Sequence, residues 1–189
     1  MTLKDLVIKN RSYRRFQQDV KISNETLREL VDLARCSASS GNRQALRFML
    51  SAEPEKNAVI FSHLGFAAQL KWAGPAEGER PSAYIIILGD KEATQNFGSD
   101  HGIAAQSILL GATEKGLGGV MMGGVRRDGL MTALNIPPRY EILLVLALGK
   151  PKEKVVLETV GPDGNTKYWR DDEGVHHVPK RRLDDIIIG

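Results

Sequence analysis

The sequence "DHGIAAQSILLGATEKGLGGVMMGG", residues 100–124, is the most informative segment for the fold, because it joins a helix pattern to a strand pattern through a run of glycines. Its first part, 100–116, is apolar almost all round, which is typical of a helix at the centre of a fold or at a subunit interface. The letters "GGVMM" then predict a short strand. Four glycines would let the backbone approach something flat and bulky: Gly118, Gly119, Gly123 and Gly124.

Helix and strand patterns surround this stretch without strict alternation. Apolar spacing and capping residues predict helices within 2–10, 22–39, 54–73 and 127–135, and strands at 46–52, 82–90 and 140–149. This order favours an α+β fold with a mixed, mostly antiparallel sheet flanked by helices. We expect a single domain over residues 1–189, with a β-hairpin excursion at 155–178 that turns at "GPDGN".

Composition predicts a cytoplasmic protein with no membrane partner. The longest apolar runs, "AYIIIL" (83–88) and "ILLVLAL" (142–148), are far shorter than the roughly 20 residues that a membrane-spanning helix needs. The N-terminal segment mixes acidic and basic residues and has no apolar core typical of an export signal. A single cysteine, Cys36, cannot form an intrachain disulfide, which agrees with a reducing compartment.

Positive charge gathers in two clusters, "RSYRR" at 11–15 and "PKRR" at 179–182, within a net charge of +3. Such runs often lie on solvated surface. They also suit an anionic ligand, because arginine pairs with phosphate through two parallel hydrogen bonds and a serine hydroxyl adds a further donor. Both interpretations are open from charge alone, and so is a nucleic-acid partner.

Patterns for direct side-chain catalysis are missing from the sequence. The four histidines form no metal-binding spacing, and we expect the adjacent His176 and His177 at a surface strand or loop. There is no G-x-S-x-G nucleophile motif. A dinucleotide fingerprint G-x-G-x-x-G starting at Gly116 fails because Met121 occupies its last position. These absences point to a bound cofactor that carries the reactivity, and to no metal.

Four segments, in order along nearly the whole chain, match motifs of a known family. "RSYRRF" resembles an R-S-x-R/K-x-F motif, and "SASSGNRQALRF" resembles A-P-S-x-G-N-x-Q-P-W. "AAQSILLGATEKGLGGVMMGG" is similar to a central helix followed by G-L-G and G-G, and "VPKRRLDDII" is similar to a basic C-terminal phosphate clamp. With these motifs the chain resembles the FMN-dependent nitroreductase family.

The resemblance implies a nitroreductase-like fold, an obligate homodimer, and noncovalent FMN in each of two interface clefts. It assigns FMN contacts in the first motif to Arg11, Ser12 and Tyr13, with Arg11 near the phosphate or ribityl chain. Arg14 is implied to be both a contact and the catalytic residue. It would lie near N1 and O2 of the flavin ring, where negative charge develops on reduction.

The other motifs are implied to complete the FMN site. One set would frame the cleft or reach it from the partner subunit: Ser39, Ser40, Asn42 and Gln44. Gly123 and Gly124 match the place where backbone N–H groups approach flavin N5. Lys180 and Arg182 match the C-terminal phosphate ligands.

The resemblance implies an oxidoreductase that uses NADH or NADPH to reduce nitroaromatics, quinones or a related electrophilic small molecule. Because the chain has no second nucleotide fingerprint, we expect donor and acceptor to use the flavin in turn, in a ping-pong mechanism. An alternative is an FMN-binding protein that stores or senses flavin without turnover. Nucleic-acid binding has little support, because no recognised module and no stacking series of aromatic residues accompany the basic clusters.

Overall fold

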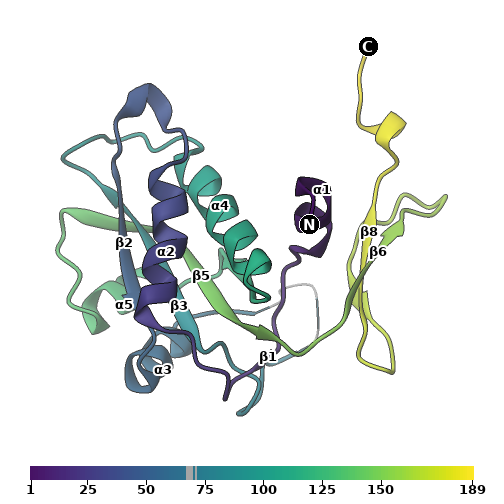
Figure 1. Ribbon diagram of the computed structural model, residues 1–189, viewed down its shortest axis with the longest axis horizontal. Helices are drawn as coiled ribbons and strands as arrows, with labels where there is room; N and C mark the ends of the chain where they lie inside the picture. The colour runs from purple at the N-terminus through teal and green to yellow at the C-terminus, as the bar shows by residue number, and fades with distance from the viewer. Residues whose placement is uncertain (67–69, 71) are drawn as a thin grey trace.

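The computed structural model describes residues 1–66, 70 and 72–189 and has an antiparallel sheet of five strands at its centre (Figure 1). These strands are β1 (Phe16–Gln17), β2 (Leu46–Ser51), β3 (Ala83–Asp90), β4 (Gly118–Met122) and β5 (Tyr140–Pro151). The order is β1-β5-β3-β2, and β4 also pairs with β5. Every pairing in this sheet is antiparallel. The predicted α+β fold is confirmed.

Helices cover both faces of the sheet. They are α1 (Leu3–Lys9), α2 (Asn24–Arg35), α3 (Pro54–Ser62), α4 (Asp100–Glu114) and α5 (Arg127–Ala133), with short 3-10 turns at Ser40–Asn42 and Leu183–Asp185. α2 and α4 pack side by side on one face, while α3 and α5 lie on the other. None of the helices in the described part of the chain is long and apolar enough to cross a membrane.

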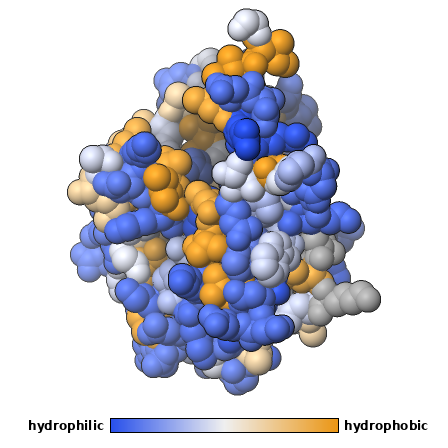
Figure 2. Space-filling view, turned by 90° about the vertical axis from the view of Figure 1, so that its right-hand side faces the viewer, coloured by the Kyte–Doolittle hydropathy of each residue, from blue (hydrophilic) through white to orange (hydrophobic). Residues whose placement is uncertain are grey.

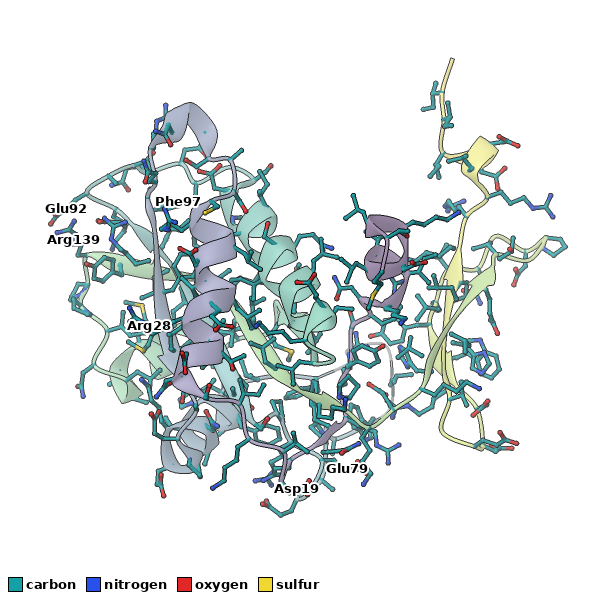
Figure 3. All side chains as sticks on the ribbon, viewed as in Figure 1. Asp19, Arg28, Glu79, Glu92, Phe97 and Arg139 are labelled. Atoms are coloured by element: carbon teal, nitrogen blue, oxygen red, sulfur yellow. The ribbon has the colours of Figure 1, made fainter. Side chains whose placement is uncertain are left out.

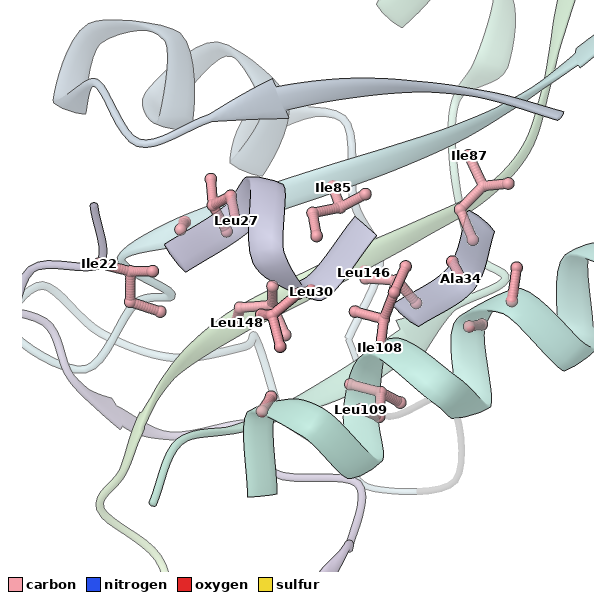
Figure 4. Packing of buried hydrophobic residues seen from close by; sticks show 14 residues of the cluster. Ile22, Leu27, Leu30, Ala34, Ile85, Ile87, Ile108, Leu109, Leu146 and Leu148 are labelled. Carbon is pink, nitrogen blue, oxygen red and sulfur yellow. The ribbon is translucent and has the colours of Figure 1, made fainter. Parts of the chain in front are cut away.

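β3 is buried along its whole length because both of its faces are covered. Ile85 and Ile87 point into the cluster under α2 and α4, which Figure 4 shows from close by. Tyr84, Ile86 and Leu88 belong to the cluster under α3 and α5. The near-continuous apolar run of this strand therefore reflects two cores, one on each side of the sheet.

The glycines that follow α4 are needed first for packing within the protein. A Cβ atom on Gly119 would lie 2.7 Å from the carbonyl oxygen of Ala147 and 2.8 Å from Leu109 Cδ2. A Cβ on Gly118 would lie 2.6 Å from the Tyr13 ring. Only glycine therefore lets β4 approach β5, α4 and Tyr13 this closely, so packing within the protein already requires these two glycines, whatever ligand lies beside them.

Capping residues in the sequence correctly predicted where α1 and α2 begin. Thr2 and Asp5 form the capping box of α1, and the Ser23 side chain accepts the Thr26 N–H at the start of α2. The helix expected over 54–73 is shorter, because α3 ends at Ser62 and the chain then forms a bridge between Leu64 and Val125. Positions 67–69 and 71 of that expected helix lie outside the described residues.

A second, three-stranded sheet forms an arm at the right of Figure 1. Its strands are β6 (Val155–Thr159), β7 (Trp169–Arg170) and β8 (His176–Lys180). β6 and β8 run parallel, and only β7 and β8 are antiparallel neighbours. The arm thus differs from the hairpin expected at 155–178, because parallel strands need a long connection, which residues 160–175 provide.

Candidate functional site

A cleft of about 400 Å³ lies between the arm and the main body. Its walls come from the segment after α1, the buried helix α4, strand β4 and the arm. Three lining side chains are cationic: Arg11, Arg14 and Lys180. The polar ones include Asn10, Ser12, Gln106, Tyr168 and His176, and the apolar ones are Leu109, Met121 and Val178. The cleft therefore combines positive charge with apolar surface, as a site for an anionic ring compound requires.

The backbone of the basic segment is held by the buried carboxylate of Glu153. The Glu153 side chain is fully buried and accepts the backbone N–H groups of Arg14 and Arg15, the latter at 3.3 Å. Its other oxygen accepts a charge-assisted hydrogen bond from Arg170 at 2.9 Å. On the opposite side, the Tyr13 N–H donates to the Gly119 carbonyl at 3.1 Å. These contacts fix the backbone from which Arg11 and Arg14 project.

Both arginines of the cleft keep donors available for a ligand. Arg11 donates through Nη2 to the Val7 carbonyl at 2.7 Å, while its buried Nε has no hydrogen-bond partner among the described residues. Arg14 donates through Nη1 to the Ser12 carbonyl at 3.2 Å, and its guanidinium lies 5.0 Å from the Tyr168 ring centre. Burial lowers the pKa of both arginines, but a guanidinium remains charged in proteins.

His176 lies inside this site, so the expectation of a surface position is wrong for it. The residue is 1% exposed, and its Nε2 lies 3.5 Å from Arg14 Nη1. Burial, assisted by the positive charges of Arg14 and Arg170, lowers the pKa of His176 to about 4. His176 is therefore neutral at neutral pH and adds no positive charge beside Arg14.

The adjacent histidine faces the other side of β8, as the two-residue period of a strand requires. His177 stacks on Trp169 with 4.0 Å between ring centres and lies between the carboxylates of Asp171 and Glu158. The Asp171 hydrogen bond and then the Glu158 hydrogen bond raise the pKa of His177. The neighbouring histidines thus face opposite sides of β8, one buried in the cleft wall and one between carboxylates. The alternation of side chains along a strand was the sequence signal that could have placed His176 in the site.

Comparison with known proteins identifies the family to which this fold belongs. The family model described as "Nitroreductase family" matches residues 7–150, from the second half of α1 through nearly all of β5. The chain belongs to the nitroreductase family. It is therefore an oxidoreductase of the nitroreductase type.

Individual relatives agree with this membership. A protein of Archaeoglobus fulgidus, named as an NADH dehydrogenase/NAD(P)H nitroreductase, is 27% identical over 74% of this chain and 80% of its own length. The nitroreductase family protein of Clostridium novyi NT has a TM-score of 0.67 at 22% identity and covers 95% of each chain. The NADPH:FMN oxidoreductase of Vibrio harveyi, solved with NAD+, has a TM-score of 0.63 at 25% identity, covering 79% of this chain and 68% of its own.

Within this nitroreductase-family chain, the cleft gathers only part of the expected site. Arg11, Ser12, Arg14 and Lys180 line it together. The Tyr13 hydroxyl instead donates to the Lys9 carbonyl at 3.0 Å, and the Tyr13 ring packs beside Gly118. Arg182 lies beyond β8, exposed, at the start of the Leu183–Asp185 turn.

The remaining expected residues lie elsewhere in the same chain. The turn after α2 is held to the start of α4, because the Ser40 N–H donates to the Asp100 carboxylate at 3.0 Å. Ser39 and Gln44 line a separate cavity of about 230 Å³, and Asn42 adopts a left-handed φ of 52°. Gly123 and Gly124 follow β4 directly, and the Gly124 carbonyl accepts a hydrogen bond from the Gly65 N–H.

Sequence reasoning missed three residues that shape the cleft. Glu153 is 139 positions from Arg14, and no spacing pattern links the two. Tyr168 and His176 come from the arm, which the family model does not cover. Tyr168 is also tilted against His176 with 5.1 Å between ring centres. The arm thus completes one wall of the site.

Proposed function

We propose that this chain, acting as one domain over residues 1–189, binds FMN noncovalently in the cleft and uses NADH or NADPH to reduce a nitroaromatic, a quinone or a related electrophile. The observation that carries the proposal is the convergence of Arg11, Arg14 and Lys180 on one cleft with partly apolar walls. The Vibrio harveyi relative, an NADPH:FMN oxidoreductase solved in complex with NAD+, lends further support. The cytoplasmic location stays a prediction from the sequence.

The cleft residues fit the two parts of FMN. A phosphate is bound by cationic side chains whose hydrogen-bond donors are not already used. The buried Nε of Arg11 is such a donor, because it has no partner among the described residues. The flat ring needs apolar surface, which Leu109, Met121 and Val178 provide. FMN would supply hydride or electron transfer, so no side-chain nucleophile is required.

Arg14 is positioned to stabilise negative charge in the cleft. Its backbone N–H donates a hydrogen bond to the Glu153 carboxylate. Its side chain donates to the Ser12 carbonyl and lies against the Tyr168 ring. A buried, positioned guanidinium stabilises negative charge that develops nearby more strongly than a solvated one does. Neutral His176 beside it adds no competing charge. We therefore assign Arg14 the role of stabilising the ring as it becomes anionic.

We also propose that the active form is a homodimer. Large apolar side chains are exposed on α1 and on the C-terminal tail, namely Leu3, Val7, Ile8, Leu183, Ile186, Ile187 and Ile188. Figure 2 looks at the side that carries the arm and tail, where hydrophobic surface runs between hydrophilic regions. Surface of this kind favours association. The second subunit would bring Ser39, Ser40, Asn42 and Gln44 to the cleft. Gly123 and Gly124 would offer backbone N–H groups to flavin N5, and Arg182 would join Lys180 at the phosphate.

Cofactor and turnover are tested together. Purified protein is expected to be yellow, to release FMN on denaturation, and to lose its visible flavin band when mixed anaerobically with NADH or NADPH. Double-reciprocal plots for varied donor at several acceptor concentrations should be parallel, because donor and acceptor would occupy one cleft in turn. Protein that takes up no FMN would refute the proposal, and intersecting lines would refute the ping-pong order. A bound flavin that neither NADH nor NADPH bleaches would favour the alternative of a flavin store or sensor.

The dimer is tested by sedimentation equilibrium of the FMN-loaded protein. We expect a mass of twice the 20.8 kDa chain, and a shift towards monomer when Val7 and Ile8 on α1 are both replaced by serine. A matched control replaces Leu33, an exposed leucine on α2, with serine. A folded monomer that holds FMN tightly at every concentration would contradict the shared cleft.

A further inference from the structure

A second cavity, of about 310 Å³, lies apart from the flavin cleft and shares no lining residue with it. It is enclosed by the start of α3 and the chain leading into β3, together with the loops at 18–21 and 77–82. Asp19 and Glu79, labelled near the lower edge of Figure 3, mark where these two loops meet. The loops are joined because both the Gly78 and Arg80 N–H groups donate to Gln18 Oε1.

Three buried polar atoms in the wall of this cavity have no hydrogen-bond partner among the described residues. They are Tyr84 Oη, Ser82 Oγ and Arg80 Nε. Tyr84 is 0% exposed, and residues two apart in an extended chain face the same side, so its side chain and that of Ser82 share one wall. Native proteins rarely leave buried polar groups unpaired, because each costs free energy. These atoms therefore suggest a ligand.

The unpaired atoms are all able to donate. The Glu77 carboxylate in the wall is already engaged, because it accepts from Arg80 Nη1 at 2.8 Å and from Gln18 Nε2 at 3.0 Å. The amide of Asn57 is satisfied by Ser51 Oγ and the Ser82 carbonyl. The other charged lining residues, Asp19 and Lys21, are exposed and of opposite sign. The inner wall thus offers donors to an acceptor group.

One side of the wall is apolar. Phe61 lies beneath the Arg80 guanidinium with 4.6 Å between the guanidinium carbon and the ring centre. Pro54, Ala58 and Pro81 complete this side. We propose that the cavity binds a small carboxylate with an apolar body, of the size of one substituted aromatic ring. Its carboxylate accepts hydrogen bonds from Tyr84, Ser82 and Arg80, and its ring packs against Phe61.

Phenylacetate, with ¹³C-labelled tyrosine in the purified protein, tests the proposal. The resonance that disappears in Tyr84→Phe belongs to Tyr84, and we expect it to move in a saturable way on titration while that of Tyr140 stays in place. Arg80→Gln should weaken binding at least about tenfold, because a charge-assisted donor is lost. Arg28→Gln, on the exposed face of α2 (Figure 3), should leave affinity within about twofold.

The site specificity is checked by a second variant and a second signal. Ser82→Ala, which removes one small hydroxyl, should weaken binding about three- to tenfold even if Arg80→Gln fails to fold. The flavin absorbance should stay unchanged at saturation, which separates this site from the cleft. The proposal would be overturned if the Tyr84 chemical shift did not change on titration, or if wild type, Ser82→Ala and Arg80→Gln bound phenylacetate with equal affinity. Either result would count against it regardless of the flavin absorbance.

Discussion

Glu153→Ala is expected to lower the free energy of unfolding by about 3–5 kcal/mol, the range for removing one partner of a buried ion pair. The Glu153 side chain is 0% exposed, and that of its partner Arg170 is 17% exposed. Alanine would leave this guanidinium and the backbone N–H groups of Arg14 and Arg15 without their acceptor. The same change should reduce FMN affinity, because the backbone that carries Arg14 is no longer held.

Urea unfolding followed by circular dichroism measures this loss. Glu153→Gln keeps an acceptor oxygen and should lie between the wild type and Glu153→Ala. Glu29→Ala is the control, because Glu29 pairs with Lys115 on the surface, where ion pairs contribute little. If Glu153→Ala unfolds at the same urea concentration as Glu29→Ala, then Glu153 does not have the structural role assigned to it.

Arg14→Gln is expected to lower the two-electron reduction potential of bound FMN by about 30–65 mV. This range corresponds to about 1.5–3 kcal/mol, the contribution of one charge-assisted interaction with the reduced ring. Arg14 projects into the cleft, and burial strengthens its field. Arg11→Ala should instead weaken FMN binding about 10- to 150-fold, because that residue is assigned to the phosphate or ribityl chain in both oxidation states.

Redox titration of each FMN-loaded variant separates these roles. The control is Arg15→Gln, which removes the same charge one position along the chain. Arg15 makes a two-pronged pair with Glu79, at 2.6 and 2.7 Å, and does not line the cleft. The reduction potential of FMN bound to Arg15→Gln should stay close to that of the wild type. Equal shifts in Arg14→Gln and Arg15→Gln would indicate a general effect of charge and would contradict the placement of Arg14.

Residue types and their spacing were enough to predict those features that depend on near neighbours. The capping box at Thr2 and Asp5 and the cap at Ser23 started helices where expected, because these hydrogen bonds join residues three apart. The apolar runs of β3 and β5 predicted buried strands, since burial on both faces needs only a continuous apolar pattern. The order of motifs was also enough to indicate the nitroreductase family, which the comparison then confirmed.

Contacts between residues far apart in the chain became known only from the folded structure. It placed Glu153 at the backbone of Arg14, and His176, 162 positions away, beside the Arg14 side chain. It also paired β6 with β8 in parallel and left the turn at 39–44 at the start of α4. Such contacts are set by how strands and helices pack across the whole chain, and no local spacing encodes them. The cleft was therefore predictable in its charges, but its buried carboxylate and neutral histidine depended on long-range packing.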